Sequence, residues 1–431
     1  MQSWTRRHLL RTGSLGLTLT AGVGLTPPPA RAGTLAAATG GGAPTDNAYW
    51  QAIAGQYDVT RDITQLENGN WVMMARPVLA AYQRHQQRVN AETSFYSRRG
   101  FGKDARAVMA RVAGLIGCGL DEITLTRNAT EALLALITGY NRLRPGDTVI
   151  YSDLDYDAMQ AGMVSLRQRR GVDVIRIDLP EPASHQGLID AYEQALKAHP
   201  KTRLLLLTHL THRTGLILPV AEITAMARQR GVDVIVDAAH SIGLVDFTAD
   251  TLGADFVGYN LHKWIGAPVG VGVLYIRRGR VPDIDPSPGE MEAAPENIRA
   301  RVHTGTRDLA AMLAVPDAID FHQSIGTARI AARLRHLRDL WAEPLRDHPA
   351  YEILTPTDPR LTGGLTSFRR RGVTDDKENA AIAQTLLERY GIFTVHRSGL
   401  SRGACVRVTP ALFNQEADVE KLLAALRHMA G

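Results

Sequence analysis

The stretch Asp233-Val234-Ile235-Val236-Asp237 decides the fold. Its apolar residues follow one another without polar alternation and end in an acid, which is typical of a strand buried on both faces of a sheet. Five other runs share this pattern, at residues 147–151, 173–177, 203–208, 255–258 and 271–276. Segments of helical length separate several of them, at residues 129–140, 158–170, 187–199 and 220–230.

This alternation of strands and helices predicts parallel strands joined by crossover helices. We therefore expect an α/β fold, with a large, mostly parallel sheet and helices on both faces. After residue 310 the pattern changes to a long helical stretch at 309–348, strand-like runs at 366–369 and 406–409, and a last helix at 416–429. These segments predict a smaller α+β domain. The expected division is an N-terminal arm at 33–60, a large domain at 61–310 and a small domain at 311–431.

Residues 1–32 are typical of an export signal. Arg6 and Arg7 precede a short apolar stretch, and a proline run then leads to Ala30-Arg31-Ala32, a cleavage pattern. The order of these parts resembles twin-arginine signals. We expect export by the twin-arginine machinery to the periplasm or beyond. The apolar stretch is too short to span a bilayer, so we do not expect a membrane-embedded protein.

Composition excludes several functional classes. Of 431 residues, 45% are hydrophobic and 22% are charged, which is globular composition. Without the four arginines of residues 1–32, 45 basic residues face 44 acidic ones, so no nucleic-acid-binding surface is expected. Two cysteines, Cys118 and Cys405, are too few for a disulfide framework or a four-thiolate zinc site. His209 and His212 lack further ligands nearby, so we predict no metal.

Among six lysines, Lys263 alone follows the end of a buried strand. Ligands of open α/β sheets bind outside the carboxyl ends of the strands. A lysine there has a lowered pKa and can form an imine with a carbonyl group. Asp237 ends another strand and needs a cationic partner, which a protonated pyridine nitrogen would supply. His240, three residues on, can donate a hydrogen bond to the same ligand. Helix capping by Asp237 and simple packing of His240 are the alternatives.

A phosphate site is predicted at the start of helix 129–140. Asn128 is a helix cap, Ala129 and Thr130 open the first turn, and Glu131 completes a capping box. Backbone N–H groups at such a helix start bind phosphate. A plain helix cap with no ligand is the alternative.

Seven motifs occur in one order along the chain, and together they resemble the class V pyridoxal-phosphate enzymes of aminotransferase fold type I, the isopenicillin N epimerase-like and cysteine desulfurase group. They are Asn-Ala-Thr-Glu-Ala at 128–132, Tyr-Asp-Ala-Met at 156–159, Thr-His-Leu-Thr-His-Arg-Thr-Gly at 208–215, Asp-Ala-Ala-His-Ser at 237–241, His-Lys-Trp at 262–264, Gly-Thr-Arg-Asp at 305–308 and Arg-Val-Thr-Pro-Ala-Leu-Phe-Asn at 407–414.

The resemblance implies pyridoxal 5′-phosphate as cofactor, with Lys263 as the residue that binds its aldehyde and moves the substrate proton. Asp237 would hold the ring nitrogen and His240 the ring oxygen. The phosphate of the cofactor would be bound by Asn128, Ala129, Thr130 and His262, and by Thr306 from a second subunit. Tyr156 and Thr211 would contact the ring. Arg407 would bind the carboxylate of the substrate, and Asn70 would contact the substrate from a nearby loop. A homodimer with shared sites is therefore expected, with Thr306 and Arg307 contributed across the interface.

The absence of a cysteine at one position reduces the number of reactions that the sequence allows. A desulfurase needs a thiolate on a mobile loop, and residues 396–402 contain none. Cys405 lies on a strand next to Arg407. We predict epimerase or aminotransferase chemistry at the amino group or α-carbon of an amino-acid-containing metabolite. The alternatives are a C–S lyase or desulfurase, and a non-catalytic periplasmic binding protein.

Overall fold

The computed structural model describes residues 42–431, and a seven-stranded sheet lies at its centre. The strand order is β2-β8-β7-β6-β5-β3-β4. The strands are β2 (Ile123–Thr126), β3 (Thr148–Ser152), β4 (Asp173–Ile177), β5 (Thr202–Thr208), β6 (Asp233–Asp237), β7 (Phe256–Asn260) and β8 (Gly272–Ile276). All six predicted runs are strands, which confirms the α/β fold. Two details differ from the expectation: β8 is antiparallel to both of its neighbours, and β2 was not predicted.

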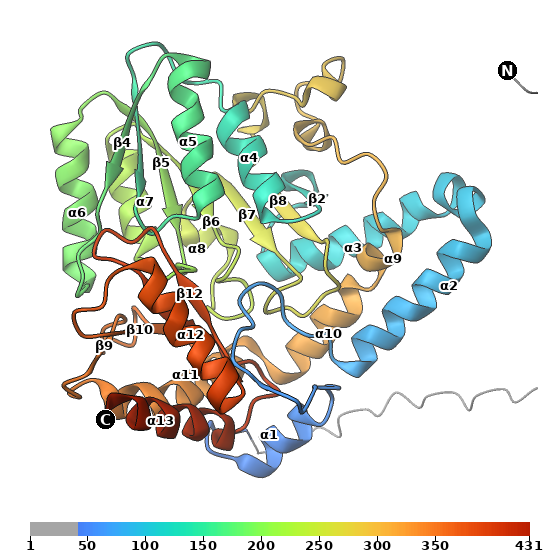
Figure 1. Cartoon of the computed structure of the whole chain (residues 1–431). Helices are drawn as coiled ribbons and strands as arrows, with labels where there is room; N and C mark the ends of the chain where they lie inside the picture. The colour runs from blue at the N-terminus through green and yellow to red at the C-terminus, as the bar shows by residue number, and fades with distance from the viewer. Residues whose placement is uncertain (1–41) are drawn as a thin grey trace, which may run out of the picture. The chain divides into compact units, whose positions relative to one another are not determined.

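Both faces of this sheet are buried, as its unbroken apolar runs predict. On β5, Leu205 and Leu207 belong to one hydrophobic core, whereas Leu204 and Leu206 belong to the other. Helices α4 (Ala129–Gly139) and α5 (Asp157–Arg170) cover one face (Figure 1). The opposite face is covered by α3 (Phe101–Ile116), α6 (His185–Ala198), α7 (Val220–Gln229) and the short α8 (Ala249–Leu252).

The C-terminal part contains a second, antiparallel sheet of order β12-β13-β10-β9. Its strands are β9 (Tyr351–Ile353), β10 (Thr366–Arg370), β12 (Val395–Arg397) and β13 (Cys405–Val408), and its helices α12 (Asp376–Tyr390) and α13 (Glu416–Ala430). The long helix expected at 309–348 is wrong as a single element. It is divided into α9 (Leu309–Leu313), α10 (Val315–Ile325) and α11 (Thr327–Ala342), and Gly326, with φ of 94°, separates α10 from α11.

The N-terminal segment joins the C-terminal elements. After α1 (Asn47–Ala54), strand β1 (Thr64–Gln65) pairs in parallel with β11 (Ile392–Phe393), and α2 (Arg76–Arg99) follows. The described residues, 42–431, lie within one compact unit, and the expected boundaries at 60 and 310 stay predictions. The expected signal at 1–32 lies outside the described residues. Within residues 42–431, no helix combines the length and apolarity that crossing a bilayer requires.

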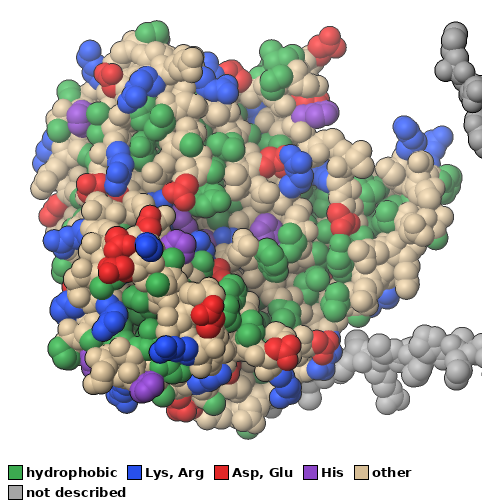
Figure 2. Space-filling model, viewed as in Figure 1, with side chains coloured by type: hydrophobic (Ala, Val, Ile, Leu, Met, Phe, Trp, Pro, Cys, Tyr) green, Lys and Arg blue, Asp and Glu red, His purple; other side chains and the backbone are tan. Residues whose placement is uncertain are grey.

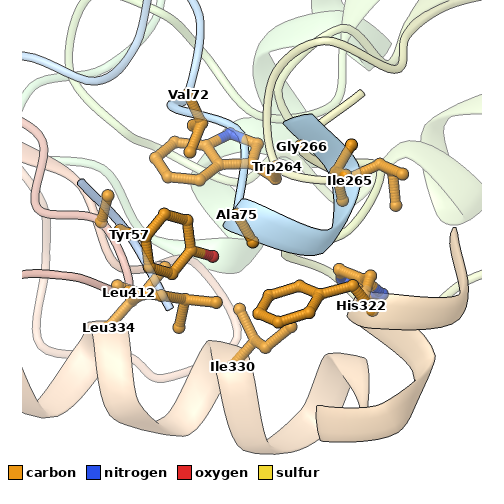
Figure 3. Close-up of a pocket in the computed structure, with 13 residues that line it drawn as sticks. Tyr57, Val72, Ala75, Trp264, Ile265, Gly266, His322, Ile330, Leu334 and Leu412 are labelled. Atoms are coloured by element: carbon orange, nitrogen blue, oxygen red, sulfur yellow. The ribbon is translucent and has the colours of Figure 1, made fainter. Parts of the chain in front are cut away.

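The segment that carries Lys263 is anchored by the next residue. Trp264 is buried and packs into an apolar pocket with Tyr57, Val72 and Leu412 (Figure 3). The void that remains there is about 20 Å³, which holds little more than one water molecule. This packing holds the chain just after β7 in one position.

Candidate active site

A cavity of about 960 Å³ lies where the parallel strands end. Histidine side chains are visible in this central region, between the foot of α5 and β12 (Figure 2). Ten of the twelve predicted site residues line the cavity: Asn70, Asn128, Ala129, Thr130, Tyr156, Asp237, His240, His262, Lys263 and Arg407. The fold thus brings together residues that are separated by up to 337 positions along the chain.

Lys263 lies beside His240 in this cavity. Its Nζ is 2.7 Å from Nε2 of His240, while Nδ1 of that ring is buried without a partner among the described residues. Burial, together with the smaller effect of the charge of Arg407, lowers the pKa of Lys263 to about 7. Burial and the charge of Lys263 also lower the pKa of His240 well below its ordinary value. Near neutral pH, a large share of Lys263 is therefore an uncharged, nucleophilic amine.

Asp237 is the last residue of β6 and lines the cavity. Its Oδ1 accepts a hydrogen bond of 2.9 Å from the N–H of Ala239. Burial raises the pKa of Asp237, although this hydrogen bond and Lys263 favour the charged form. A buried carboxylate in this state is stabilised by a ligand that brings a positive charge, such as a protonated ring nitrogen.

The N-terminus of α4 provides hydrogen-bond donors for a phosphate, but the N–H of Ala129, which was predicted to be one of them, is already used. Asn128 caps the helix by accepting 2.8 Å from the N–H of Glu131. The N–H of Ala129 donates instead to Oδ1 of Asn260, at 2.7 Å. Asn260 ends β7, lines the cavity and was not predicted, because nothing in its local sequence marks it. Its amide nitrogen and the Thr130 hydroxyl are the donors that remain for a ligand.

His262 adds a further group to this end of the cavity. Its Nδ1 lies 3.1 Å from the carbonyl oxygen of Val271, so Nε2 is the ring nitrogen left for a ligand. Burial and the charge of Lys263 lower the pKa of His262 to about 4. The ring is consequently neutral until an anion binds beside it.

Tyr156 stands at the mouth of the cavity. Its side chain is half-exposed, and its ring meets that of His212 edge-on with centroids 5.1 Å apart. His212 also lines the cavity, although it was considered from the sequence only as a metal ligand.

Arg407 is fully buried on β13 and is already paired. Its Nη2 donates to both carboxylate oxygens of Glu67, at 2.6 and 2.8 Å, and its Nη1 donates to the carbonyl oxygen of His212 at 2.6 Å. Glu67 was not predicted. The two residues are 340 positions apart, so no local spacing connects them.

Two predicted residues do not line this cavity. Thr211 is fully buried in the turn after β5, where its hydroxyl lies 2.8 Å from that of Thr214. Thr306 is exposed to solvent. Arg307, which was expected to reach a partner's site, lines the cavity of its own chain and donates to the carbonyl oxygen of Leu125. Thr208, at the end of β5, lines the cavity where Thr211 was expected.

The described residues contain no group of three or more side chains arranged to hold a metal ion. The donor set instead fits an aromatic cofactor with an aldehyde and a phosphate. Lys263 offers the amine, Asp237 the carboxylate that lacks a cation, and the α4 start with His262 the anion site. The family model for class-V aminotransferases matches residues 73–422. The chain belongs to the class-V aminotransferase family.

Relatives of this class-V chain include the isopenicillin N epimerase of Streptomyces clavuligerus, which is 29% identical and covers 89% of this chain and 99% of its own length. A putative L-cysteine desulfhydrase of Oryza sativa subsp. japonica is 31% identical over 60% of this chain and 57% of its own. Among solved structures, the cysteine desulfurase CsdA of Escherichia coli has a TM-score of 0.74 at 21% identity, covering 88% of this chain and 98% of its own.

A further solved structure shows the same fold with the cofactor in place. A lysine-to-alanine variant of C-DES, with glycine covalently linked to its PLP cofactor, matches with a TM-score of 0.73 at 23% identity, over 86% of this chain and 98% of its own. The large sheet with its helices is fold type I of the pyridoxal-phosphate enzymes. The cofactor of this class-V enzyme is pyridoxal 5′-phosphate.

Proposed function

We propose that this protein acts at the amino group or α-carbon of an amino-acid-containing metabolite, by epimerase or aminotransferase chemistry. The observation that carries the proposal is the placement of Lys263, an amine with a lowered pKa, in one cavity with Asp237 and His240. The isopenicillin N epimerase relatives, which match over nearly their whole length, support this class of substrate.

Each of these residues has a defined role. When bound, pyridoxal phosphate supplies an electron sink for the electrons of a bond broken at the α-carbon. Lys263 would hold the aldehyde of the cofactor through Nζ, and the same amine would take and return the proton of the substrate. Asp237 would favour a protonated ring nitrogen, and His240 would donate to the ring oxygen. Asn128, Thr130, Asn260 and His262 would hold the phosphate, and Tyr156 would contact the ring.

A C–S lyase is the second candidate, because the desulfhydrase and desulfurase relatives support it. A route through a cysteine persulfide is disfavoured by the cysteines of this chain. Cys405 is fully buried, and burial raises the pKa of its thiol to about 11. Burial also raises the pKa of Cys118 to about 12. Neither thiol is a thiolate near neutral pH, as a sulfur-accepting nucleophile must be.

One experiment separates these candidates. The purified protein is incubated with a panel of amino compounds in deuterated water, beside a Lys263→Ala variant. Exchange of the α-hydrogen without keto-acid release indicates epimerisation, keto-acid release with amine transfer indicates transamination, and sulfide release indicates C–S lysis. The native protein is expected to be yellow and the variant colourless and inactive. A colourless native protein that still turned substrate over would contradict the mechanism. A yellow protein inert towards every amino compound would support the non-catalytic binding protein instead.

We also propose that the enzyme is exported and works as a homodimer. The pattern at residues 1–32 supports export by the twin-arginine machinery, which carries folded proteins and so would carry the cofactor with them. Detection in a periplasmic fraction of the protein shortened by the cleaved signal, lost when Arg6 and Arg7 are changed to Lys, tests the export proposal.

A further inference from the structure

Arg407, the residue expected to receive a substrate carboxylate, is occupied by a carboxylate of the chain itself. Both oxygens of Glu67 lie within 2.8 Å of its Nη2. The side chains of both residues are almost completely buried, at 1% exposure for Arg407 and 7% for Glu67. A pair held this closely and away from water is a strong one, because little solvent screens it.

The backbone around Glu67 is built to hold this pair. Glu67 forms a parallel bridge with Thr409 beside β13, and Nδ2 of Asn68 donates 2.9 Å to the carbonyl oxygen of Thr409. Gly69 follows, where a Cβ atom would lie 2.3 Å from Nη2 of Arg407. Only glycine leaves room for the guanidinium at this position. Glu67 therefore lies against Arg407 because its segment is fixed there, and not because a flexible surface side chain happens to reach it.

A second guanidinium in the cavity has no such partner. Arg397 on β12 lies 3.7 Å from Oε1 of Glu67, beyond hydrogen-bond distance, and its guanidinium makes no hydrogen bond with residues 42–431. Two guanidinium groups thus share one carboxylate, and the positive charge that remains belongs to Arg397. Both guanidinium groups lower the pKa of Lys263, and Arg407 has the larger effect.

We propose that Glu67 is a specificity-determining residue: it withholds Arg407 from the lone carboxylate of a small amino acid and reserves the cavity for larger amino compounds that bring an anionic group to Arg397. This inference rests on the proposed function, because it assumes that the substrate carries the amine on which the enzyme acts. A small amino acid carries one carboxylate, one carbon from its amine, so it has to compete with Glu67 for Arg407. A longer compound avoids that competition by reaching Arg397.

The test measures binding of carboxylates that carry no amine, by calorimetric titration of the pyridoxal-phosphate-loaded protein. The native protein is expected to bind glutarate more tightly than propionate. Glu67→Gln keeps the shape of the side chain but removes its charge, and it is expected to tighten propionate binding about tenfold or more. Glu416→Gln is the matched control, because Glu416 pairs with the buried Arg333 outside the cavity and its loss is expected to leave both affinities unchanged. Propionate binding that stays within twofold in Glu67→Gln, or weakens, would overturn the inference.

Arg397→Gln provides an independent test should Glu67→Gln fail to fold. Its guanidinium pairs with Glu67 at 3.7 Å but makes no hydrogen bond with the described residues, so the variant is expected to fold and to bind glutarate about tenfold more weakly. Unchanged glutarate binding would also overturn the inference. Neither ligand can react, so these results do not depend on catalysis. A protein inert towards every amino compound refutes the proposed function, whereas the titrations decide the role of Glu67.

Discussion

Asp237 shows how one residue has opposite effects on the empty and the loaded protein. Its carboxylate is buried, its pKa is raised by that burial, and a ring nitrogen would supply the missing cation. We expect Asp237→Asn to melt higher than the native protein when both lack cofactor, because the variant buries no charge. With cofactor, kcat is expected to fall on the order of 10²–10³-fold. Calorimetry of both forms and a rate assay measure the two effects, and a variant that loses stability without cofactor contradicts this account.

The lowered pKa of Lys263 predicts how cofactor attachment depends on pH. The reactive amine is uncharged, and the pKa of about 7 makes it mostly protonated at pH 6 and mostly free at pH 8. Covalent attachment of pyridoxal phosphate to the empty protein is therefore expected to accelerate about tenfold across this interval. Arg407→Gln removes a positive charge and should shift the midpoint upward. Absorbance measured during reconstitution follows the rate, and a flat profile between pH 6 and 8 would refute the assignment.

Cys405 tests the exclusion of persulfide chemistry. Its thiol is fully buried, and its Sγ lies 3.7 Å from the carbonyl oxygen of Arg213. We expect Cys405→Ala to keep its rate with sulfur-containing amino acids within about twofold, at a stability cost of about 1 kcal/mol for the lost buried atom. Cys118→Ala serves as the comparison. Mass spectrometry of the native protein during turnover should find no persulfide, and a persulfide on either cysteine would establish a desulfurase instead.

At the level of residues, the sequence predicts charged groups at strand ends and misses groups whose role depends on a distant contact. Lys263 and Asp237 follow buried apolar runs, and the sheet brings such positions to one edge. Glu67 has no comparable local signal, and Asn260, although it ends β7, carries no charge that marks it. Glu67 enters the cavity through a pairing with β13 that depends on residues 340 positions away, and the side chain of Asn260 is defined by its contact with Ala129.

At the level of elements, the sequence predicts six of the seven strands of the large sheet and the parallel direction of β3 to β7, but not the direction of β8. The run at 271–276 has the same apolar composition as its parallel neighbours, yet β8 is antiparallel, because only a short connection follows β7. Parallel strands need a crossover of a dozen or more residues. The single long helix at 309–348 is wrong for a different reason: a composition rich in Ala, Leu and Arg favours one helix, whereas Gly326, with its positive φ, separates α10 from α11.

The contact between β8 and the start of α4 gives a prediction at this scale. A Cβ atom on Gly272 would lie 2.4 Å from the carbonyl carbon of Asn128. Gly272→Ala is expected to force the strand and helix apart, to cost about 1–3 kcal/mol of stability and to weaken pyridoxal phosphate binding. Gly114→Ala is the control, because a Cβ atom there meets nothing within 4 Å in α3. It should instead stabilise the protein by about 0.5–1 kcal/mol. Chemical unfolding and cofactor titration measure both, and equal effects of the two variants would rule out the proposed contact.

At the level of the whole molecule, several large apolar side chains face solvent beside the cavity. Trp71 is 52% exposed and Val269 is 56% exposed, and both line the cavity. On α2, which extends away from the sheet (Figure 1), Phe95 is 74% exposed. Exposed apolar side chains that line one cavity, as Trp71 and Val269 do, are typical of surfaces that contact another protein. The expected homodimer would cover them and bring Thr306 to the partner's cofactor.

Mixing two defective chains tests whether Thr306 acts across such an interface. Thr306→Val removes one hydroxyl, and its loss from a phosphate contact is expected to weaken cofactor binding about tenfold or more. A Lys263→Ala chain is inactive in its own cavity but still carries the native Thr306. In a dimer of these two chains, the cavity of the Thr306→Val chain receives the native threonine from its partner. Activity at limiting cofactor should then exceed that of either variant alone. If Thr306 serves its own chain, or if the enzyme is a monomer, mixing restores nothing and the activities simply average.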